Sequence, residues 1–172
     1  MRRALFFATA LLAPSLAAAV PLRVSAAERR ELESLARRFF ESTRDGARSP
    51  EAVFPSRAEL GALFQRDEGL PGPVRVAARP NEPVVLRQLN AIDRDVQALR
   101  ERFRAGVFVG LAGPVARENT LRQRPCGRFA RRDAQCADGL MLEYRVGNET
   151  RRFNVDTLVR AGGRWRILDV RH

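Results

Sequence analysis

Two cysteines, Cys126 and Cys136, offer the most distinctive chemistry in this sequence. Their spacing differs from the C-x-x-C pattern of redox pairs, and a zinc site needs more ligands than two thiols and a terminal His172 supply. We therefore expect no metal and no cofactor. In an exported chain two cysteines most simply form one disulfide, so we predict a Cys126–Cys136 bridge. Closing a loop of this size would contribute about 2 to 3 kcal/mol of stability.

Arginine carries all of the chain's basic charge and crowds around these cysteines. All 31 basic side chains are arginine, and the formal net charge of +11 permits attraction to anionic partners. Arg117 to Arg132 is predicted to form a long, bridged, basic hairpin, with candidate anion-binding residues at Arg122, Arg124, Arg128, Arg131 and Arg132. A single aromatic residue, Phe129, is too few for the stacking that single-strand nucleic-acid binders use. We expect a solvated loop, and keep a module that binds anionic surfaces as a second alternative.

The C-terminal tail, Gly139 to His172, contains three runs of alternating apolar residues separated by glycine-containing turns. This pattern predicts a three-stranded antiparallel meander. A two-residue turn at Gly147-Asn148 would form the first hairpin and pair Leu142 with Phe153. That register keeps one face of the hairpin continuously apolar.

The second turn of the meander, at Gly162-Gly163, allows two registers. A two-residue loop sets Val159 opposite Arg166, which breaks the apolar alternation. A three-residue loop pairs Val159 with Trp165 instead. We prefer the longer loop because a one-residue slip sends every side chain to the wrong face. In this register Asp169 becomes a carboxylate on the apolar face, and therefore a candidate general base.

The N-terminal residues 1–19 have the three-part layout of a secretory signal peptide. Arg2 and Arg3 precede the apolar run Ala4 to Leu12, and small residues follow Pro14. The run is short for a membrane span, which needs about 20 apolar residues, so we expect cleavage, at a site up to about residue 25. Only an uncleaved signal would tie the chain to a membrane. We therefore predict a periplasmic or secreted bacterial protein.

The remaining residues, 26–172, are predicted to form a single α+β domain. Capping boxes begin helices after Ser25 and Ser56, and a third, longer helix runs from Leu86 toward Gly106. A short strand is possible at 74–78, and a bent, buried strand is predicted at 107–116. These N-terminal helices would pack on a curved antiparallel sheet that ends in the meander.

The order of these elements and the ending "GGRWRILDVR" resemble the nuclear transport factor 2-like superfamily, a cystatin-like α+β cone. This group includes ketosteroid isomerases and polyketide cyclases, and the resemblance covers roughly residues 26–172. It implies a curved sheet that wraps the long helix and leaves a pocket at its open end. The side chains expected to line that pocket are Tyr144, Phe153, Trp165, Ile167 and Phe103.

For function, we expect a non-catalytic exported domain that binds a small apolar molecule or a protein partner through this sheet-lined pocket. The alternative is an isomerase- or cyclase-like enzyme with Asp169 as the general base. The isomerases of the resembled group pair such a base with a tyrosine, but Tyr144 would lie about 13 Å from Asp169 at the usual strand rise. That distance argues against the enzyme. The oligomeric state stays open.

Overall fold

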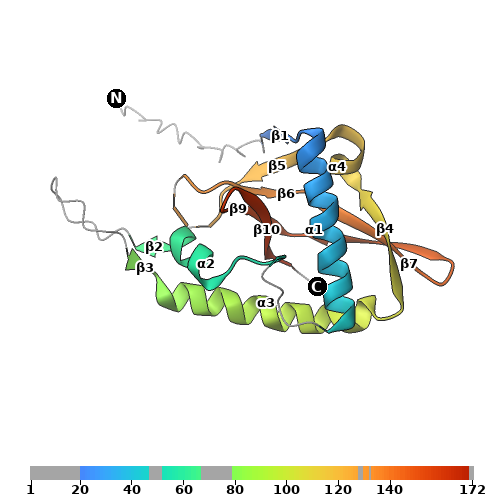
Figure 1. Cartoon of the computed structure of the whole chain (residues 1–172), viewed down its shortest axis with the longest axis horizontal. Coiled ribbons are helices and arrows are strands. Elements are labelled where there is room, and N and C mark those ends of the chain that lie inside the picture. Colours follow the sequence, from blue (N-terminus) through green and yellow to red (C-terminus); the bar gives the residue numbers. More distant parts are fainter. Residues whose placement is uncertain (1–19, 47–51, 67–78, 128–129, 132, 171–172) are drawn as a thin grey trace, which may run out of the picture.

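The fold combines helices with antiparallel sheets, the predicted α+β class, as a computed structural model shows (Figure 1). The structure describes residues 20–46, 52–66, 79–127, 130–131 and 133–170. The strand considered at 74–78 lies outside the described residues. The helices are α1 (Ala26–Asp45), α2 (Arg57–Leu63), α3 (Glu82–Phe103) and α4 (Gly113–Glu118).

The strands form two main sheets that share continuous segments of chain. One sheet has the order β1-β5-β6-β9-β10, the other has the order β4-β7-β8, and β2 pairs with β3. Only Gly139 separates β6 from β7, and only Asp156 separates β8 from β9, so both segments run from one sheet into the other. The strands are β1 (Pro21–Arg23), β2 (Gln65–Arg66), β3 (Arg79–Pro80), β4 (Gly106–Ala112), β5 (Thr120–Arg124), β6 (Cys136–Asp138), β7 (Leu140–Val146), β8 (Glu149–Val155), β9 (Thr157–Ala161) and β10 (Arg164–Asp169).

Helix α1 forms where the sequence predicts it. Ser25 and Glu28 make the predicted capping box, and Gly46 ends the helix in the left-handed conformation, with φ +77°. The buried residues recur at three- and four-residue spacings, so they form one apolar stripe that faces the sheets. That stripe consists of Leu32, Leu35, Ala36, Phe39, Phe40 and Thr43.

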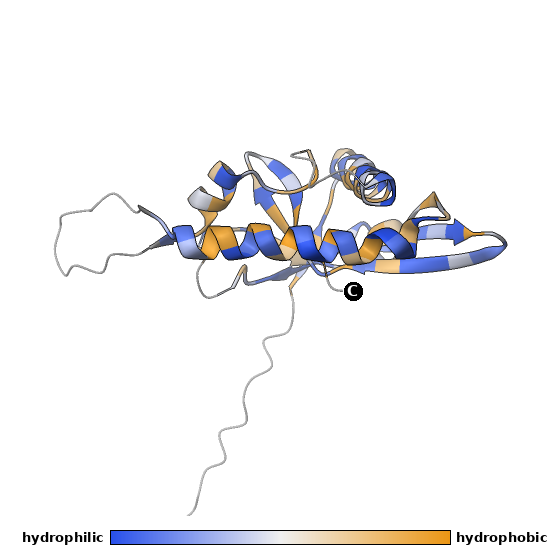
Figure 2. Cartoon of the chain, turned by 90° about the horizontal axis from the view of Figure 1, so that it is seen from below, coloured by the Kyte–Doolittle hydropathy of each residue, from blue (hydrophilic) through white to orange (hydrophobic). Residues whose placement is uncertain are grey.

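Helix α3 crosses α1 at a steep angle, and Figure 2 shows α1 almost end-on behind it. The two helices meet through Phe103, whose ring lies 4.7 Å from that of Phe40 and 6.0 Å from that of Phe39. The sequence predicted that this helix runs from Leu86, but α3 already begins at Glu82. Leu86 is exposed, and Val85 is the residue that enters the core.

The first hairpin of the meander has the predicted register. Leu142 pairs with Phe153 across β7 and β8, and Tyr144 pairs with Arg151. On the outer face the Glu143 carboxylate accepts a hydrogen bond of 3.0 Å from the Nε of Arg152. The alternation of apolar residues was sufficient to predict this register, because only one face of the hairpin is buried.

The register of the second hairpin was wrong. Val159 pairs with Arg166, as in the two-residue loop, and Trp165 pairs with Arg160. An irregularity between Ile167 and Asp169 then shifts the pairing by one residue. Both faces of β9 and β10 are covered, so three consecutive residues of β9, Thr157 to Val159, are buried. A strand buried on both faces loses the alternation on which the prediction depended.

Four short elements, α4, β1 and the paired strands β2 and β3, were not anticipated from the sequence. Residues 113–118, assigned partly to a strand, form helix α4 after Gly113, whose φ is +68°. Strand β1 pairs with β5, so the described fold begins before the helix predicted as its first element.

Within the described residues no helix is long and apolar enough to cross a membrane.

Replacing Gly106 with alanine should destabilise the protein. A Cβ at this position would lie 2.8 Å from Cζ of Phe40 and 3.1 Å from Cδ2 of Tyr144. We expect the free energy of unfolding to fall by about 1 to 3 kcal/mol, because the aromatic core would have to move. The matched control is Gly110→Ala in the same strand, where a Cβ meets nothing within 4 Å. Equal unfolding midpoints for the two variants in denaturant would contradict the packing described here.

The capping box of α1 should make stability depend on pH. The backbone N–H of Ser25, with smaller contributions from its hydroxyl and from Arg160, lowers the pKa of Glu28. A lowered pKa means that the ionised form stabilises the folded state above the unfolded-state pKa of about 4.3, and that this contribution disappears as the pH falls through the folded-state pKa. The stability difference between the wild type and Glu28→Gln should therefore be largest near neutral pH and shrink below about pH 4. A difference that does not change with pH would show that the carboxylate charge is irrelevant.

Candidate functional site

The interior of the fold is filled by aromatic rings. All five predicted pocket-lining residues belong to one buried core cluster, and none of them is more than 3% exposed. The ring of Phe103 lies 5.2 Å from that of Tyr144 and 5.4 Å from that of Phe153. None of the five lines any of the four grooves found among the described residues. The structure thus brings the predicted residues together as packed core rather than as the lining of one of these grooves.

Tyr144 keeps its hydroxyl at the edge of this core. The hydroxyl accepts a hydrogen bond of 3.3 Å from the Nε of Arg102, whose guanidinium also lies 5.3 Å from the centre of the Phe153 ring. The phenol is therefore positioned by a cation and by aromatic contacts. It is not among the residues that line a groove with Asp169.

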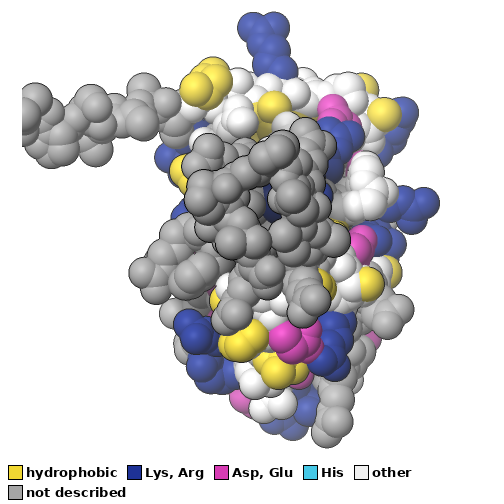
Figure 3. Space-filling view, turned by 90° about the vertical axis from the view of Figure 1, so that its left-hand side faces the viewer, with side chains coloured by type: hydrophobic (Ala, Val, Ile, Leu, Met, Phe, Trp, Pro, Cys, Tyr) yellow, Lys and Arg dark blue, Asp and Glu magenta, His cyan; other side chains and the backbone are white. Residues whose placement is uncertain are grey.

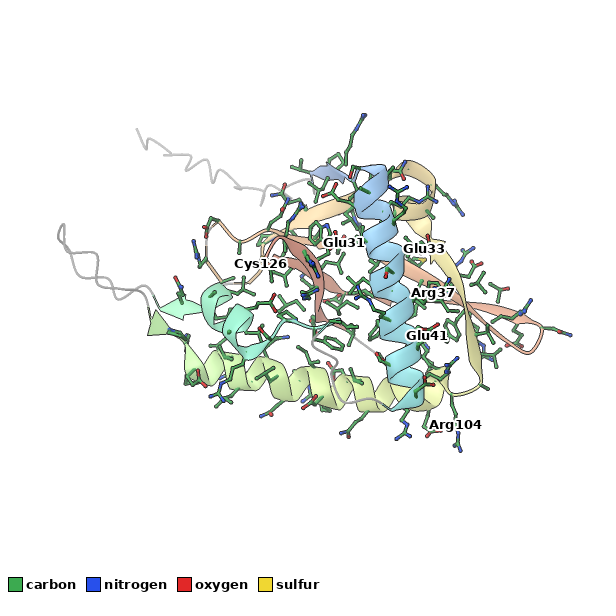
Figure 4. All side chains as sticks on the ribbon, in the orientation of Figure 1. Glu31, Glu33, Arg37, Glu41, Arg104 and Cys126 are labelled. Atoms are coloured by element: carbon green, nitrogen blue, oxygen red, sulfur yellow. A yellow bond between two sulfur atoms is a disulfide. The ribbon has the colours of Figure 1, made fainter. Side chains whose placement is uncertain are left out.

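Trp165 is held between α1 and the β9–β10 turn. Its backbone N–H donates to the carboxylate of Glu31 over 3.1 Å. Its ring lies 5.6 Å from the guanidinium of Arg160, which pairs with Glu28 at 3.0 Å. Figure 4 shows Glu31 on one side of α1 and Glu33 on the other. These contacts fix β10 against the helix and bury the indole.

Asp169 lies in a groove rather than in the core. It is partly buried at the end of β10, after the shift in register, and it lines a surface groove of about 280 Å³. It also borders a shallower depression along α3 that includes Leu86 and Arg94. We call the first of these the α3–hairpin groove; its walls are Phe64, Val84, Arg87, Gln88, Arg124, Pro125, Cys126, Gly127, Thr157, Leu168 and Asp169.

The α3–hairpin groove combines an apolar base with basic side chains. Phe64, Val84 and Leu168 belong to or pack against a second core cluster, behind the disulfide. The side-chain amide of Gln88 donates to the carbonyl of Leu168 over 2.6 Å, which ties α3 to β10. Apolar surface with a few convergent polar groups is the usual composition of a small-molecule site.

Two arginines line the α3–hairpin groove, and they differ in their partners. Arg124 donates to the backbone carbonyl of Asp156 over 3.2 Å and lies 3.7 Å from its carboxylate. Arg87 is exposed and forms no ion pair within the described part of the chain. Arg87 is therefore the guanidinium at this groove that is available to an anionic group of a ligand.

The basic hairpin exists, but acidic residues compensate its charge. Strands β5 and β6 pair with Arg122 opposite Asp138, and these side chains make an ion pair of 2.8 Å. Arg131 donates to Asp133 over 2.5 Å, and this hydrogen bond lowers the pKa of the carboxyl. Arg128 and Arg132 lie outside the described residues, and Arg117 belongs to α4 rather than to the hairpin.

The wider surface follows the same pattern. On the described part of the face shown in Figure 3, arginines are scattered, and several lie beside acidic side chains. The described part of this face lacks the continuous positive stripe that a nucleic acid backbone requires. The three predicted anion-binding arginines that the structure describes, Arg122, Arg124 and Arg131, each have an acidic partner within the protein.

The disulfide between Cys126 and Cys136 is confirmed, with a Cα–Cα distance of 5.2 Å. Cys136 is buried in the second core cluster, whereas Cys126 is partly buried and lines the α3–hairpin groove. No group of three potential metal ligands occurs among the residues that the structure describes.

A second groove of about 370 Å³ lies between α2, the β9–β10 turn and residues 131–135. Its charged residues are already paired within the protein. Arg160 binds Glu28, Arg131 binds Asp133, and Glu59 caps α2 and lies 3.9 Å from Arg166. This groove therefore offers less to a charged ligand than the α3–hairpin groove.

Sequence reasoning missed Arg87 and Gln88. Both occupy polar positions of an amphipathic helix, where a solvated side chain is the usual case. Only the approach of α3 to β10 and to the bridged hairpin gives them a common role.

Comparison of the chain with known protein families, with curated proteins and with solved structures found no match.

The filled interior can be tested through Trp165, the chain's single tryptophan. Because the indole is only 1% exposed, we expect blue-shifted fluorescence and little quenching by acrylamide. The denatured protein supplies the reference for full exposure. Strong quenching in the native protein would show that an open pocket reaches Trp165.

Proposed function

We propose that this protein is an exported, non-catalytic binding domain whose α3–hairpin groove takes a small amphipathic ligand with an acidic group. One observation carries the proposal: an apolar base formed by Phe64, Val84 and Leu168 lies beside the exposed guanidinium of Arg87, which makes no ion pair with any residue that the structure describes. The apolar part of a ligand would contact the base, and its carboxylate would pair with Arg87. Guanidinium groups bind carboxylates well because their planar forks of N–H donors match.

The size of the groove favours a small molecule over a protein partner. A volume of about 280 Å³ is near the lower end of the range for small-molecule sites. A stable protein interface buries on the order of 1,000 Å² or more, with a larger apolar centre than this groove offers. We therefore place the ligand among compact organic acids rather than among polypeptides.

Export is part of the proposal. The N-terminal segment has the layout of a signal peptide, and a disulfide is typical of an oxidising compartment. The periplasm or the extracellular space satisfies both conditions.

The order of elements, with helices α1 to α3 ahead of a curved antiparallel sheet, supports membership of the nuclear transport factor 2-like superfamily.

An isomerase- or cyclase-like activity is the alternative, and one observation favours it: Asp169 lines the groove. General-base catalysis of this kind works best in a site that excludes water and that stabilises a developing oxyanion. Here the groove is open, and Tyr144 is in the core with its hydroxyl bound by Arg102. Binding without chemistry therefore fits the geometry better.

Binding of phenylbutyrate, phenylbutanol and phenylbutylamine to the purified mature protein tests the proposal. The three probes share an apolar body and differ in head-group charge, so calorimetric titration should rank the acid above the alcohol and the amine. Arg87→Ala should lower the affinity for phenylbutyrate about two- to fivefold, because an exposed ion pair is worth up to about 1 kcal/mol. The affinity for phenylbutanol should not change.

The matched control is Arg145→Ala, which removes another exposed arginine on β7, outside the groove. This variant keeps the net charge equal to that of Arg87→Ala, so any general electrostatic effect is the same in both. Equal weakening by the two substitutions, or equal affinity for the acid and the amine, would reject the site.

A further inference from the structure

We infer that the Cys126–Cys136 disulfide controls the α3–hairpin groove, so that ligand binding and reduction of the bridge oppose each other. The inference rests on the proposed function and adds redox control to the same site. It follows from where the two sulfur atoms lie relative to the groove.

The bridge holds the wall of the groove in place. Arg124, the last residue of β5, pairs with Cys136, the first residue of β6. Beyond this pair the chain leaves the ladder, and Pro125, Cys126 and Gly127 form the wall. Further along, the backbone N–H of Arg131 donates to the carbonyl of Leu63 over 2.9 Å. The disulfide thus adds a covalent link between Cys126 in this wall and Cys136 in β6 of the sheet.

The two sulfurs differ in access. Cys136 is 1% exposed and packs with Leu60, Leu63 and Val159 in the second core cluster. Cys126 is partly buried and faces the groove. On this inference, a reductant would approach Cys126 through the groove that Cys126 lines, which is the space that the ligand would occupy. The acidic group of the ligand and the attacking thiolate also carry the same charge.

Reduction by a dithiol would proceed in two exchanges. One thiolate of the reductant attacks Sγ of Cys126, which forms a mixed disulfide and releases Cys136 as a thiolate that takes up a proton. The second thiolate of the reductant then attacks its own sulfur in the mixed disulfide, which releases Cys126 and closes the reductant's disulfide. Two electrons pass from the dithiol to the protein, and both cysteines end as thiols.

Linkage makes the two events reciprocal. If the oxidised protein binds a ligand more tightly than the reduced protein, the ligand stabilises the disulfide by the same factor. We expect a factor of about ten, within the usual range of coupling between two sites. A tenfold factor corresponds to a shift of about 30 mV for a two-electron couple.

The test is a redox titration of the wild-type protein in dithiothreitol buffers, with and without saturating phenylbutyrate. Alkylation followed by mass spectrometry gives the oxidised fraction at each potential. Phenylbutyrate should move the midpoint to more negative potential by about 30 mV for each tenfold difference in affinity. At saturation, phenylbutanol should shift the midpoint only by the ratio of its own affinities for the oxidised and the reduced protein.

A bridge-free variant, Cys126→Ser with Cys136→Ala, gives the affinity ratio independently. It should bind phenylbutyrate about tenfold more weakly than the oxidised protein. Thermal unfolding first shows whether the variant is folded. If it is not, calorimetric titration of the reduced wild type provides the ratio. With glutathione as a one-thiol probe, the adduct should map to Cys126 rather than to Cys136.

The outcomes separate the two proposals. Binding to the oxidised protein with an unchanged midpoint, or with equal affinity after reduction, overturns redox control and leaves the binding function standing. An adduct on Cys136 contradicts access through the groove. Absence of binding to the oxidised protein removes both the proposed function and this inference.

Discussion

The structure depends on the burial of β10 on both of its faces. On one face Ile167 and Trp165 join the aromatic core beneath α1. On the other face Leu168 joins the cluster formed with α2, and Arg166 lies 3.9 Å from Glu59 of that helix. The backbone N–H of Ile167 also donates to the carbonyl of Val53 over 2.9 Å, so the segment before α2 covers the strand's edge. Strand β10 therefore joins the two apolar clusters.

This arrangement explains which predictions were correct. Both capping boxes depend on local sequence rules, and the β7–β8 register depends on a hairpin with one buried face, so the sequence expresses both directly. The second hairpin is different, because its residues are apolar on two faces and the alternation carries no information. The shift of register near Asp169 had no sequence signal. Neither did the exposed position of Leu86, because tertiary contacts decide which side of α3 faces the core.

The candidate site could be predicted only in part. The disulfide followed from two cysteines in a chain predicted to be exported, whereas Asp169, predicted on the apolar face, lines a surface groove. The sheet-lined pocket was expected from a family resemblance, yet the same side chains pack against one another. The groove instead needs α3, β10 and the bridged hairpin to converge. These elements are far apart in sequence, and no local pattern records that convergence.

The central claim is that ligand binding occurs at the α3–hairpin groove and not inside the sheet. The most direct measurement is chemical-shift mapping of the isotope-labelled mature protein during titration with phenylbutyrate. The account predicts that the perturbed amides cluster at Arg87, Gln88, Cys126 and Leu168. It also predicts that the indole N–H of Trp165 stays unmoved. Perturbations centred on Trp165, Tyr144 and Phe153 would contradict it and place the site in the interior of the fold.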